Sequence, residues 1–168
     1  MADSKPPPTD GTGLIALDPW LAPHADALRH RYARYRETLQ RITTAEESLL
    51  RFARGHEHFG LNRGVHDGRP GVWYREWAPE AAALHLTGDF CDWDRHRHPL
   101  RRYEFGVWHL FLPDDEFAGR LVHGSRVKVH VDSAIGPRDR IPAYIRRVVE
   151  DPTTHDFSGQ FWSPPAPY

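Results

Sequence analysis

The segment formed by residues 86–94 contains the clearest candidate for ligand chemistry in the sequence. It reads Leu-Thr-Gly-Asp-Phe-Cys-Asp-Trp-Asp, so an extended stretch runs into a turn that carries Trp93 among carboxylates, with Asp92 directly before it. An indole at a loop tip offers a flat apolar surface to the face of a pyranose ring, and neighbouring polar groups can bind the sugar hydroxyls. The segment therefore predicts a carbohydrate contact at Trp93. Packing of this indole beneath its own loop is the structural alternative.

Three other polar clusters have residue types that occur in catalytic or ligand-binding sites: the histidine pairs at 56/58 and 96/98, the arginines at 95, 97, 101 and 102, and the acidic run at 114–116. A zinc site needs three or four converging ligands, which neither histidine pair supplies. The arginine run is expected to be a solvated loop, with phosphate binding as the alternative. Adjacent carboxylates cannot lie on both sides of one glycosidic bond. We therefore predict no metal site, no catalytic residue and no cofactor.

The composition of the chain is that of an ordinary soluble globular protein. Its 168 residues include 22 Lys and Arg against 23 Asp and Glu, so the net charge of −1 gives no reason to expect a nucleic acid or an anionic membrane as partner. No apolar run approaches the roughly 20 residues of a membrane-spanning helix. A single cysteine, Cys91, excludes an internal disulfide and, without a secretory signal, predicts a reducing, cytoplasmic location.

The N-terminal third of the chain is predicted to be a tail followed by a helical arm. Residues 1–13 contain three consecutive prolines and few apolar side chains, and are expected to be disordered. Between residues 28 and 42 apolar side chains recur every three or four positions, which predicts an amphipathic helix of about five turns. A Thr-x-x-Glu spacing that begins at Thr44 predicts the start of a second helix. Residues 14–55 are therefore expected to form a two-helix arm.

Beyond residue 55 the hydrophobic period changes from that of a helix to that of strands. Short segments rich in β-branched and aromatic residues lie at 72–77, 82–87, 107–112, 127–131 and 144–149. No helical segment of useful length separates them, which favours antiparallel over parallel pairing. Residues 56–150 are therefore predicted to form an immunoglobulin-like antiparallel β-sandwich, and the chain as a whole is expected to be mainly β.

Alternation within these segments predicts which side chains face the core. In residues 127–132 the valines fall on one side and Lys128 on the other, which is typical of a sheet with one solvent-exposed face. Turn sequences predict hairpins at 66–68 and 104–106. The tryptophans within the strands are expected to belong to the core rather than to a ligand platform; they are Trp73, Trp77 and Trp108.

The C-terminal residues 151–168 combine four prolines with several aromatic side chains. Because proline disfavours helices and central strands, this segment is predicted to be a linker whose aromatic residues contact a neighbouring domain. Trp20 and Trp162 lie on either side of the predicted sandwich in the sequence. We expect each of them to be an anchor between domains.

Several motifs, taken in their order along the chain, carry a resemblance to a known family. Residues 88–93 are similar to the Gly-x-Phe-Asn-x-Trp signature of the family-48 carbohydrate-binding modules, which are β-sandwiches associated with starch and glycogen, although Cys91 replaces the Asn. Over residues 14–168 the sequence resembles the N-terminal region of eukaryote-type 1,4-α-glucan branching enzymes. The segments that carry this resemblance are 18–21, 52–55, 58–60, 73–79, 103–108, 123–128 and 161–164.

The resemblance implies an α-1,4-linked glucan such as glycogen or amylopectin as the ligand. The signature Trp that stacks on glucose maps to Trp93, and a lysine that binds the sugar from a later strand maps to Lys128. Asp92, whose carboxylate adjoins Trp93 in the sequence, is the third candidate for sugar binding. The family's second aromatic residue, expected in the hairpin after that strand, is missing, because residues 133–140 contain no Trp, Tyr or Phe. We therefore expect weak binding.

The resemblance also implies a role that is not catalytic for this chain alone. Branching enzymes act with retention through a (β/α)₈ barrel of typically about 250 residues, and none of the barrel's catalytic motifs occurs in the sequence. The chain is expected to bind α-glucan and to position or stabilise a branching-enzyme catalytic domain, in cis or in trans, with residues 151–168 leading toward it. The alternative is a protein-interaction scaffold of the same fold that docks on a glucan-metabolising enzyme without binding sugar.

Overall fold

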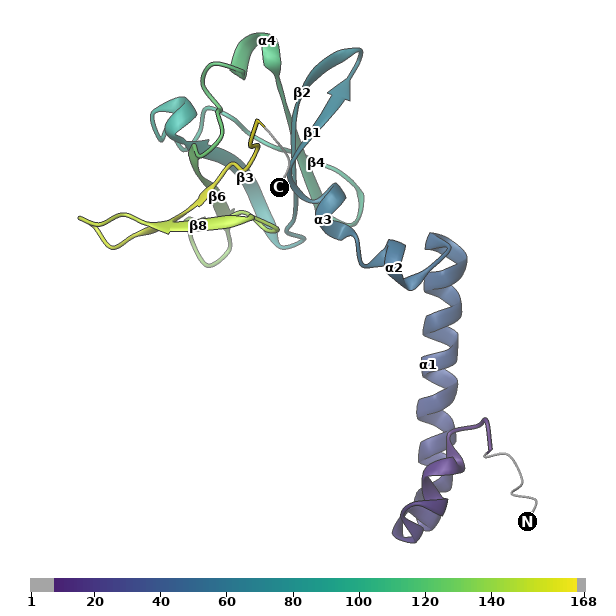
Figure 1. Cartoon of the computed structure of the whole chain (residues 1–168). Coiled ribbons are helices and arrows are strands. Elements are labelled where there is room, and N and C mark those ends of the chain that lie inside the picture. Colours follow the sequence, from purple (N-terminus) through teal and green to yellow (C-terminus); the bar gives the residue numbers. More distant parts are fainter. Residues whose placement is uncertain (1–7, 166–168) are drawn as a thin grey trace. The chain divides into compact units, whose positions relative to one another are not determined.

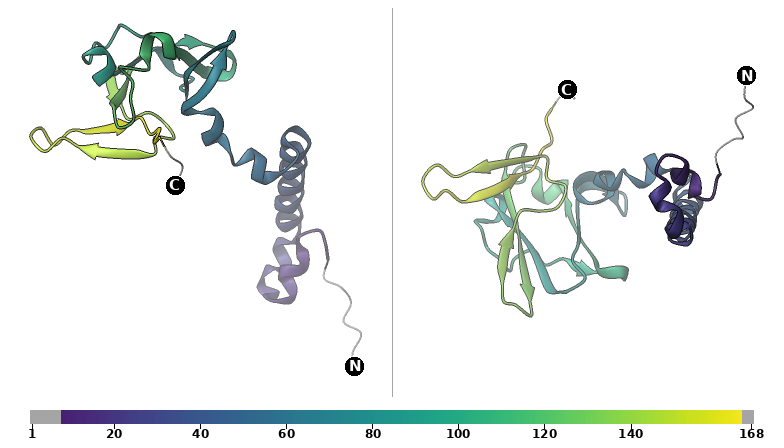
Figure 2. Two further views of the ribbon diagram at one scale, coloured as in Figure 1. Left: turned by 45° about the horizontal axis from the view of Figure 1, so that its top comes forward. Right: turned by 90° about the horizontal axis from the view of Figure 1, so that it is seen from below.

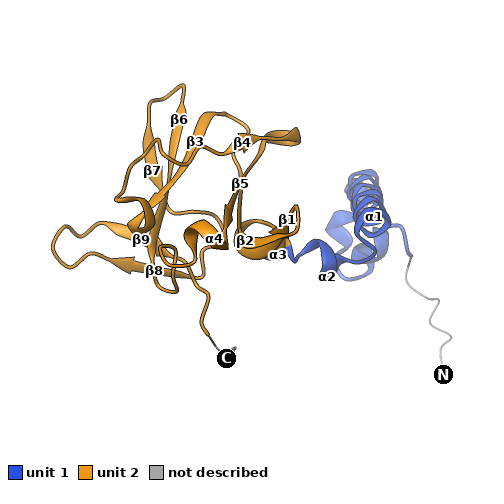
Figure 3. Cartoon of the chain, turned by 90° about the horizontal axis from the view of Figure 1, so that it is seen from above, with its two compact units in different colours: residues 1–54 blue, residues 55–168 orange. Residues whose placement is uncertain are grey.

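The computed structural model describes residues 8–165, and the chain divides into two compact units between Arg54 and Gly55 (Figure 3). Most of the tail predicted at residues 1–13 lies outside the described residues, and the first helical element begins at Thr12. Within the described part of the chain, no helix combines the length and the apolar character needed to cross a membrane.

The first unit is helical (Figure 1). Its elements are the 3₁₀ helices η1 (Thr12–Ala16) and η2 (Pro19–His24), the helix α1 (Ala25–Glu46) and the single turn α2 (Leu49–Phe52). The 22 residues of α1 include the whole predicted apolar stripe, which confirms that helix. The predicted start of the second helix was wrong, because α1 continues past Thr44 and the Ser48 side chain caps α2 by accepting from the Arg51 N–H at 3.1 Å.

The second unit consists of two antiparallel sheets. Sheet A has the strand order β1 (Gly60–His66), β2 (Arg69–Trp77), β5 (Val107–Pro113) and β4 (Arg101–Arg102). Sheet B has the order β3 (Ala81–Gly88), β6 (Arg126–Ser133), β9 (Phe157–Gln160) and β8 (Arg147–Glu150), and β7 (Arg138–Arg140) also pairs with β6. Short helical turns connect the strands: α3 (Gly55–His58), η3 (Asp89–Cys91), η4 (Glu104–Gly106) and α4 (Asp114–Phe117).

The core of this unit is built from both sheets. Tyr74 and Leu112 of sheet A and Leu84 and Val127 of sheet B are at most 1% exposed and belong to one apolar cluster. Burial of side chains of this size is worth about 1.5–3 kcal/mol each, so the cluster holds the two sheets together. The structure confirms the predicted antiparallel β-sandwich behind a helical arm, and the two predicted hairpins connect β1 to β2 and β4 to β5.

The three tryptophans expected in the core have different environments. Trp108 is buried, at 5% exposed, and its Nε1 donates to the Ala78 carbonyl at 2.9 Å. Trp73 is half-buried and Trp77 is 62% exposed, and neither belongs to the core cluster, so the expectation was wrong for both. The cause is the strand period: Tyr74 of β2 faces the core, and the odd-numbered neighbours on the same strand therefore face outward.

The face of β6 that carries Lys128 is covered rather than open to solvent. Lys128 is 8% exposed and His130 is 7% exposed, although both lie opposite the valines of the core side. Asp156, in the β8–β9 connection, pairs with Lys128, and Asp139 of β7 lies 2.7 Å from the His130 Nδ1. The alternation was predicted correctly, and the cover comes from segments distant in sequence.

The C-terminal segment differs from the linker predicted at residues 151–168. Residues 157–160 form strand β9, which pairs with β6 on one side and with β8 on the other. Figure 2 shows β8 and β9 side by side as a hairpin at the yellow end of the colour scale. The prolines of the segment lie at 152 and from 164 onward, so the strand itself keeps every N–H that pairing requires. Phe161, directly after β9, is 2% exposed and part of the core.

Candidate functional site

The loop that carries Trp93 begins where β3 ends, and a glycine is required at that point. A Cβ on Gly88 would lie 2.2 Å from the Arg126 carbonyl oxygen of the paired strand, so no side chain fits there. The chain then turns through η3, and Asp92 and Trp93 both take the left-handed conformation with φ of 55° and 61°. The Trp93 N–H donates to the Gly88 carbonyl at 3.0 Å, which closes the loop on itself.

The Trp93 indole is held by a carboxylate that also reaches the neighbouring strand. Its Nε1 donates to Asp89 Oδ1 at 3.1 Å, and the other oxygen of Asp89 accepts the Arg126 N–H at 2.7 Å. The side chain is half-buried, so part of its surface remains accessible. The indole is therefore oriented before any ligand arrives, which lowers the entropic cost of binding.

Cys91, which stands where the family signature has Asn, is completely buried under this loop. Its Sγ lies 3.5 Å from the Gly88 carbonyl oxygen and 3.8 Å from that of Asp94, within reach of weak thiol hydrogen bonds. The thiol thus fills the turn that an amide would brace, and Asp94 braces the exit of the loop by accepting from the His96 N–H at 2.9 Å.

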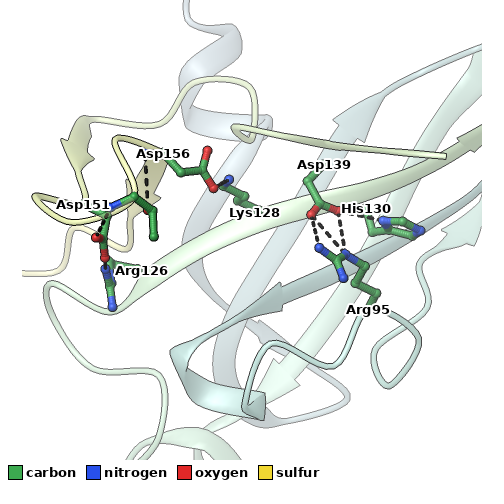
Figure 4. Close-up of polar contacts among 8 residues, drawn as sticks. Arg95, Arg126, Lys128, His130, Asp139, Asp151 and Asp156 are labelled. Carbon is green, nitrogen blue, oxygen red and sulfur yellow. Dashed lines mark hydrogen bonds and ion pairs between the residues drawn. The ribbon is translucent and has the colours of Figure 1, made fainter.

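Lys128 lies next to the start of this loop but its ammonium group is already engaged. In the register of β3 and β6 it is paired with Thr87, directly before Gly88. Its Nζ forms an ion pair with Asp156, and its side chain is 10% exposed while that of Asp156 is 65% exposed (Figure 4). The Lys128 ammonium holds the pKa of Asp156 below its usual value. No local sequence signal could have identified Asp156, because it lies 28 residues away along the chain.

A second ion pair fixes the connection that carries Asp156. Asp151 accepts the backbone N–H groups of Thr154 at 3.0 Å and Thr153 at 2.9 Å, and its other oxygen pairs with Arg126 at 3.0 Å (Figure 4). Hydrogen bonds from the Thr154 and Thr153 N–H groups, together with Arg126, lower the pKa of Asp151 to about 2. The Trp93 loop, β6 and the β8–β9 connection are therefore joined in one network of charged groups.

We expect Asp151 to make the stability of this unit sensitive to acid. Because its pKa in the folded chain, about 2, lies below the reference value of 3.8, its contribution is present above pH 3.8 and is lost as the pH falls from 3.8 toward 2. Urea unfolding of the wild type and of Asp151→Asn measures this contribution. The variant should be less stable at about pH 6, and most of the difference should be gone as the pH falls through about 2. An equal difference at both pH values would contradict the assignment.

The far end of the same sheet face is closed by a third charged group. Asp139 of β7 accepts from Arg95 at 2.8 Å and from His130 at 2.7 Å (Figure 4), and Arg95 is the main cause that lowers its pKa. Here β7 folds back on β6, where the resemblance calls for a second aromatic residue. Arg95, expected in a solvated basic loop, is therefore tied to the sheet.

The remaining sequence candidates are Asp92, Trp20 and Trp162. Asp92, which precedes Trp93 in the sequence, is exposed. Trp20 belongs to the first unit and is 88% exposed. Trp162 is half-buried in the second unit, where its ring centroid lies 4.4 Å from that of His123 and 5.4 Å from the Arg147 guanidinium.

The histidine and acidic clusters also have defined places. Two carboxylates of α4, Asp115 and Glu116, pair with Arg69 at 2.7 Å and 3.0 Å, so the acidic run is part of a surface ion-pair network. One histidine pair, 56/58, lies on α3, and the other, 96/98, lies in the loop after Trp93. Among residues 8–165, no group of three or more His, Cys, Asp or Glu side chains is placed to hold a metal ion.

If Lys128 contacts a sugar, as the resemblance implies, its ion pair with Asp156 predicts that the variant Asp156→Asn binds the sugar more tightly. The substitution leaves a largely buried ammonium without its charged partner, and a sugar hydroxyl then competes only with a neutral amide oxygen for its hydrogen bond. We expect an affinity for maltoheptaose about two- to fivefold higher and a lower melting temperature. Asp26→Asn, which alters a fully exposed carboxylate on α1 in the other unit, is the control. A lower affinity of Asp156→Asn would instead assign the sugar contact to Asp156 itself.

The sequence of the chain is similar to the sequences of branching enzymes. The chain is 40% identical over 162 residues to a 1,4-alpha-glucan-branching enzyme of Dictyostelium discoideum and 41% identical over 165 residues to one of Aspergillus oryzae. These matches cover 95% and 97% of the chain but only 23% of each enzyme. A solved structure of pullulanase type I from Bacillus subtilis complexed with maltose aligns with 66% of the chain and 14% of its own length, at 16% identity and a TM-score of 0.44.

A family model accounts for the sandwich itself. The model of carbohydrate-binding module 48, also described as the isoamylase N-terminal domain, matches residues 58–145, which is just over half of the chain. The matched residues include Trp93, its loop and Lys128. The chain therefore belongs to the carbohydrate-binding module 48 family.

Proposed function

We propose that this chain binds α-1,4-linked glucan, such as glycogen or amylopectin, through Trp93. The observation that carries the proposal is the half-buried indole that Asp89 holds at 3.1 Å at the end of a sheet, in a member of a carbohydrate-binding family. The accessible part of the indole covers the apolar face of a glucose ring. Because the ring is fixed in advance, the contact costs little conformational entropy.

In this proposal Asp92 and Lys128 bind the hydroxyls of the stacked glucose. The exposed carboxylate of Asp92 accepts hydrogen bonds from them. Lys128 donates one, for which its ammonium must share or leave Asp156. Replacing the contact with Asp156 by one with a sugar hydroxyl offsets part of the binding free energy. Together with the missing aromatic residue at 133–140, this is why we expect a dissociation constant in the millimolar range.

The chain acts as a module of a branching enzyme in glycogen or starch biosynthesis, where it positions or stabilises a catalytic domain in cis or in trans. The two branching enzymes named above, of which the chain spans 23%, support this proposal. Trp20, which is 88% exposed, is the proposed anchor of the helical arm on that domain, and Trp162 is the proposed anchor of the C-terminal segment. The chain by itself transfers no glucan. The buried thiol of Cys91 supports a reducing, cytoplasmic setting.

A scaffold without sugar binding is the second candidate, and the ion pair of Lys128 with Asp156 favours it. Such a scaffold would dock on a glucan-metabolising enzyme and ignore the polymer. One direct experiment distinguishes the glucan-binding module from the scaffold.

Affinity electrophoresis in native gels that contain amylopectin, with a β-linked glucan as the control polymer, tests the proposal. The chain should migrate more slowly in amylopectin only. The purified chain should also leave the iodine staining of amylose unchanged. Equal mobility in all gels would reject glucan binding and favour the scaffold, and a change in iodine staining would reject the non-catalytic role.

A further inference from the structure

The outward face of sheet A carries a second group of aromatic side chains. Val72 and Tyr74 of β2 point into the core, so Trp73 and Arg75 point away from it. In the register with β5, Trp73 lies opposite Phe111 and Arg75 lies opposite His109. Together with one residue of β1 these form what we call the sheet-A face: His66, Trp73, Arg75, His109 and Phe111.

Trp73 is the centre of the sheet-A face. Its ring centroid lies 4.8 Å from that of His66, 4.9 Å from that of Phe111 and 5.8 Å from that of His109. The Nε1 donates to the Val65 carbonyl at 3.3 Å, and the indole passes over Gly64, where a Cβ would come within 2.9 Å of its Cδ1. The glycine therefore makes room for an indole that is fixed in advance and half-buried, as at Trp93.

The polar groups around these rings are suited to hydroxyls. The Arg75 guanidinium lies over the Trp73 ring, 4.3 Å from its centroid, and donates to the His58 carbonyl at 3.4 Å. No carboxylate pairs with it within residues 8–165, so a sugar that stacks on the indole displaces it to the edge of the ring, where it donates to the hydroxyls. Burial, followed by Arg75, lowers the pKa of His109, so its imidazole is neutral at neutral pH and offers one donor and one acceptor. An α-glucan presents apolar C–H faces with a rim of hydroxyls, which match rings flanked by such groups. An acidic ligand would pair with Arg75 but would leave the rings without a partner.

We propose that the sheet-A face is a second α-glucan-binding surface, with Trp73 as its platform and Arg75 and His109 as hydrogen-bonding groups. This inference rests on the proposed function and extends it. Trp93 follows a strand of sheet B, whereas Trp73 lies on the outside of sheet A, so the two surfaces belong to different layers of the sandwich. Two weak surfaces give a branched polymer a multivalent contact, while each binds a short oligosaccharide independently.

Affinity electrophoresis in amylopectin gels tests the multivalent contact with Trp73→Ala, Trp93→Ala and the double variant. Each single variant should weaken retention by roughly tenfold or more, and the double variant should migrate as it does without polymer. Trp20→Ala, which removes an 88% exposed indole from the other unit, is the matched control and should be retained like the wild type. Retention of the double variant equal to that of Trp93→Ala would overturn the inference.

An NMR titration keeps the inference testable if Trp73→Ala fails to fold, because it leaves Trp73 in place. The indole N–H signal of Trp73 is followed in Trp93→Ala as maltoheptaose is added, and it should move and saturate. A signal that stays still while the wild-type Trp93 signal moves would overturn this inference alone. If neither the Trp73 signal nor the Trp93 signal shifts in the wild type, the proposed function is rejected as well. A Trp73 signal that moves only with polyglutamate, or only with protein concentration, would assign the face to an acidic partner or to a second copy, and would also overturn the inference.

Discussion

In a chain whose sheet-A face is silenced by Trp73→Ala, the further substitution Trp93→Ala is expected to abolish detectable binding of maltoheptaose. The indole is the only apolar platform in the proposed site, because the hairpin that follows β6 carries Asp139 and no aromatic side chain. Covering about 100 Å² of one indole face is worth roughly 2.5 kcal/mol, which corresponds to a change in affinity of about 70-fold. Starting from a millimolar complex, a loss of this size removes detectable binding of maltoheptaose at this site. Isothermal titration calorimetry with maltoheptaose measures this loss of affinity. Both proteins compared, with tryptophan or alanine at position 93, carry Trp73→Ala so that the sheet-A face does not contribute.

The control for this prediction must separate loss of a ligand contact from loss of the loop. Phenylalanine and alanine at position 93 are equally disfavoured in the left-handed backbone conformation, with φ of 61°, but Trp93→Phe retains an aromatic surface. It loses the hydrogen bond to Asp89 and the part of the stacking area by which an indole exceeds a phenyl ring. We expect it to bind with intermediate affinity. If alanine and phenylalanine at position 93 both bind maltoheptaose like tryptophan, then the indole packs under its loop and the sugar lies elsewhere.

Gly88→Ala is expected to have the largest effect on the stability of the second unit. The added Cβ would lie 2.2 Å from the Arg126 carbonyl oxygen and 3.0 Å from the Val127 Cα. These are backbone atoms of the paired strand β6, so no side chain can rotate away and the strands must separate. Forced overpacking of this kind costs about 3 kcal/mol. The free energy of unfolding in urea, followed by tryptophan fluorescence, should fall by that amount.

Gly119→Ala provides the matched control for Gly88→Ala. A Cβ at Gly119 has no atom within 4 Å, so the same substitution there should leave the free energy of unfolding nearly unchanged. Because Gly88 also begins the Trp93 loop, Gly88→Ala should weaken glucan binding even at temperatures where it remains folded. A stability of Gly88→Ala equal to that of Gly119→Ala would show that β3 and β6 pair less closely than described.

The fold could be predicted from the sequence wherever a local pattern decides it. The apolar stripe of α1 and the alternation in β6 depend only on the period of the side chains, and the structure has both elements. The errors arose where distant segments decide. Residues 157–160 form a strand because β6 and β8 offer partners on both sides, which no pattern within 151–168 reveals.

The candidate site shows the same division between local and distant information. The position of Trp93 in a loop after β3, next to Asp92, follows from the local motif of residues 88–93. The environment of Lys128 does not, because Asp156 comes from a connection 28 residues away. The same limit explains Trp77: its alternation was visible, but which side faced the core was decided by the packing of sheet A against sheet B.

The most direct test of the central claim is the indole N–H signal of Trp93 in the wild-type chain during a titration with maltoheptaose. This N–H proton is hydrogen-bonded to Asp89, so its signal reports on the site without any substitution. We predict that the signal moves progressively and saturates with a millimolar dissociation constant, while the signal of Trp20 stays in place. If the Trp93 signal stays in place at every sugar concentration, including those that shift other signals of the chain, the result contradicts glucan binding at this site.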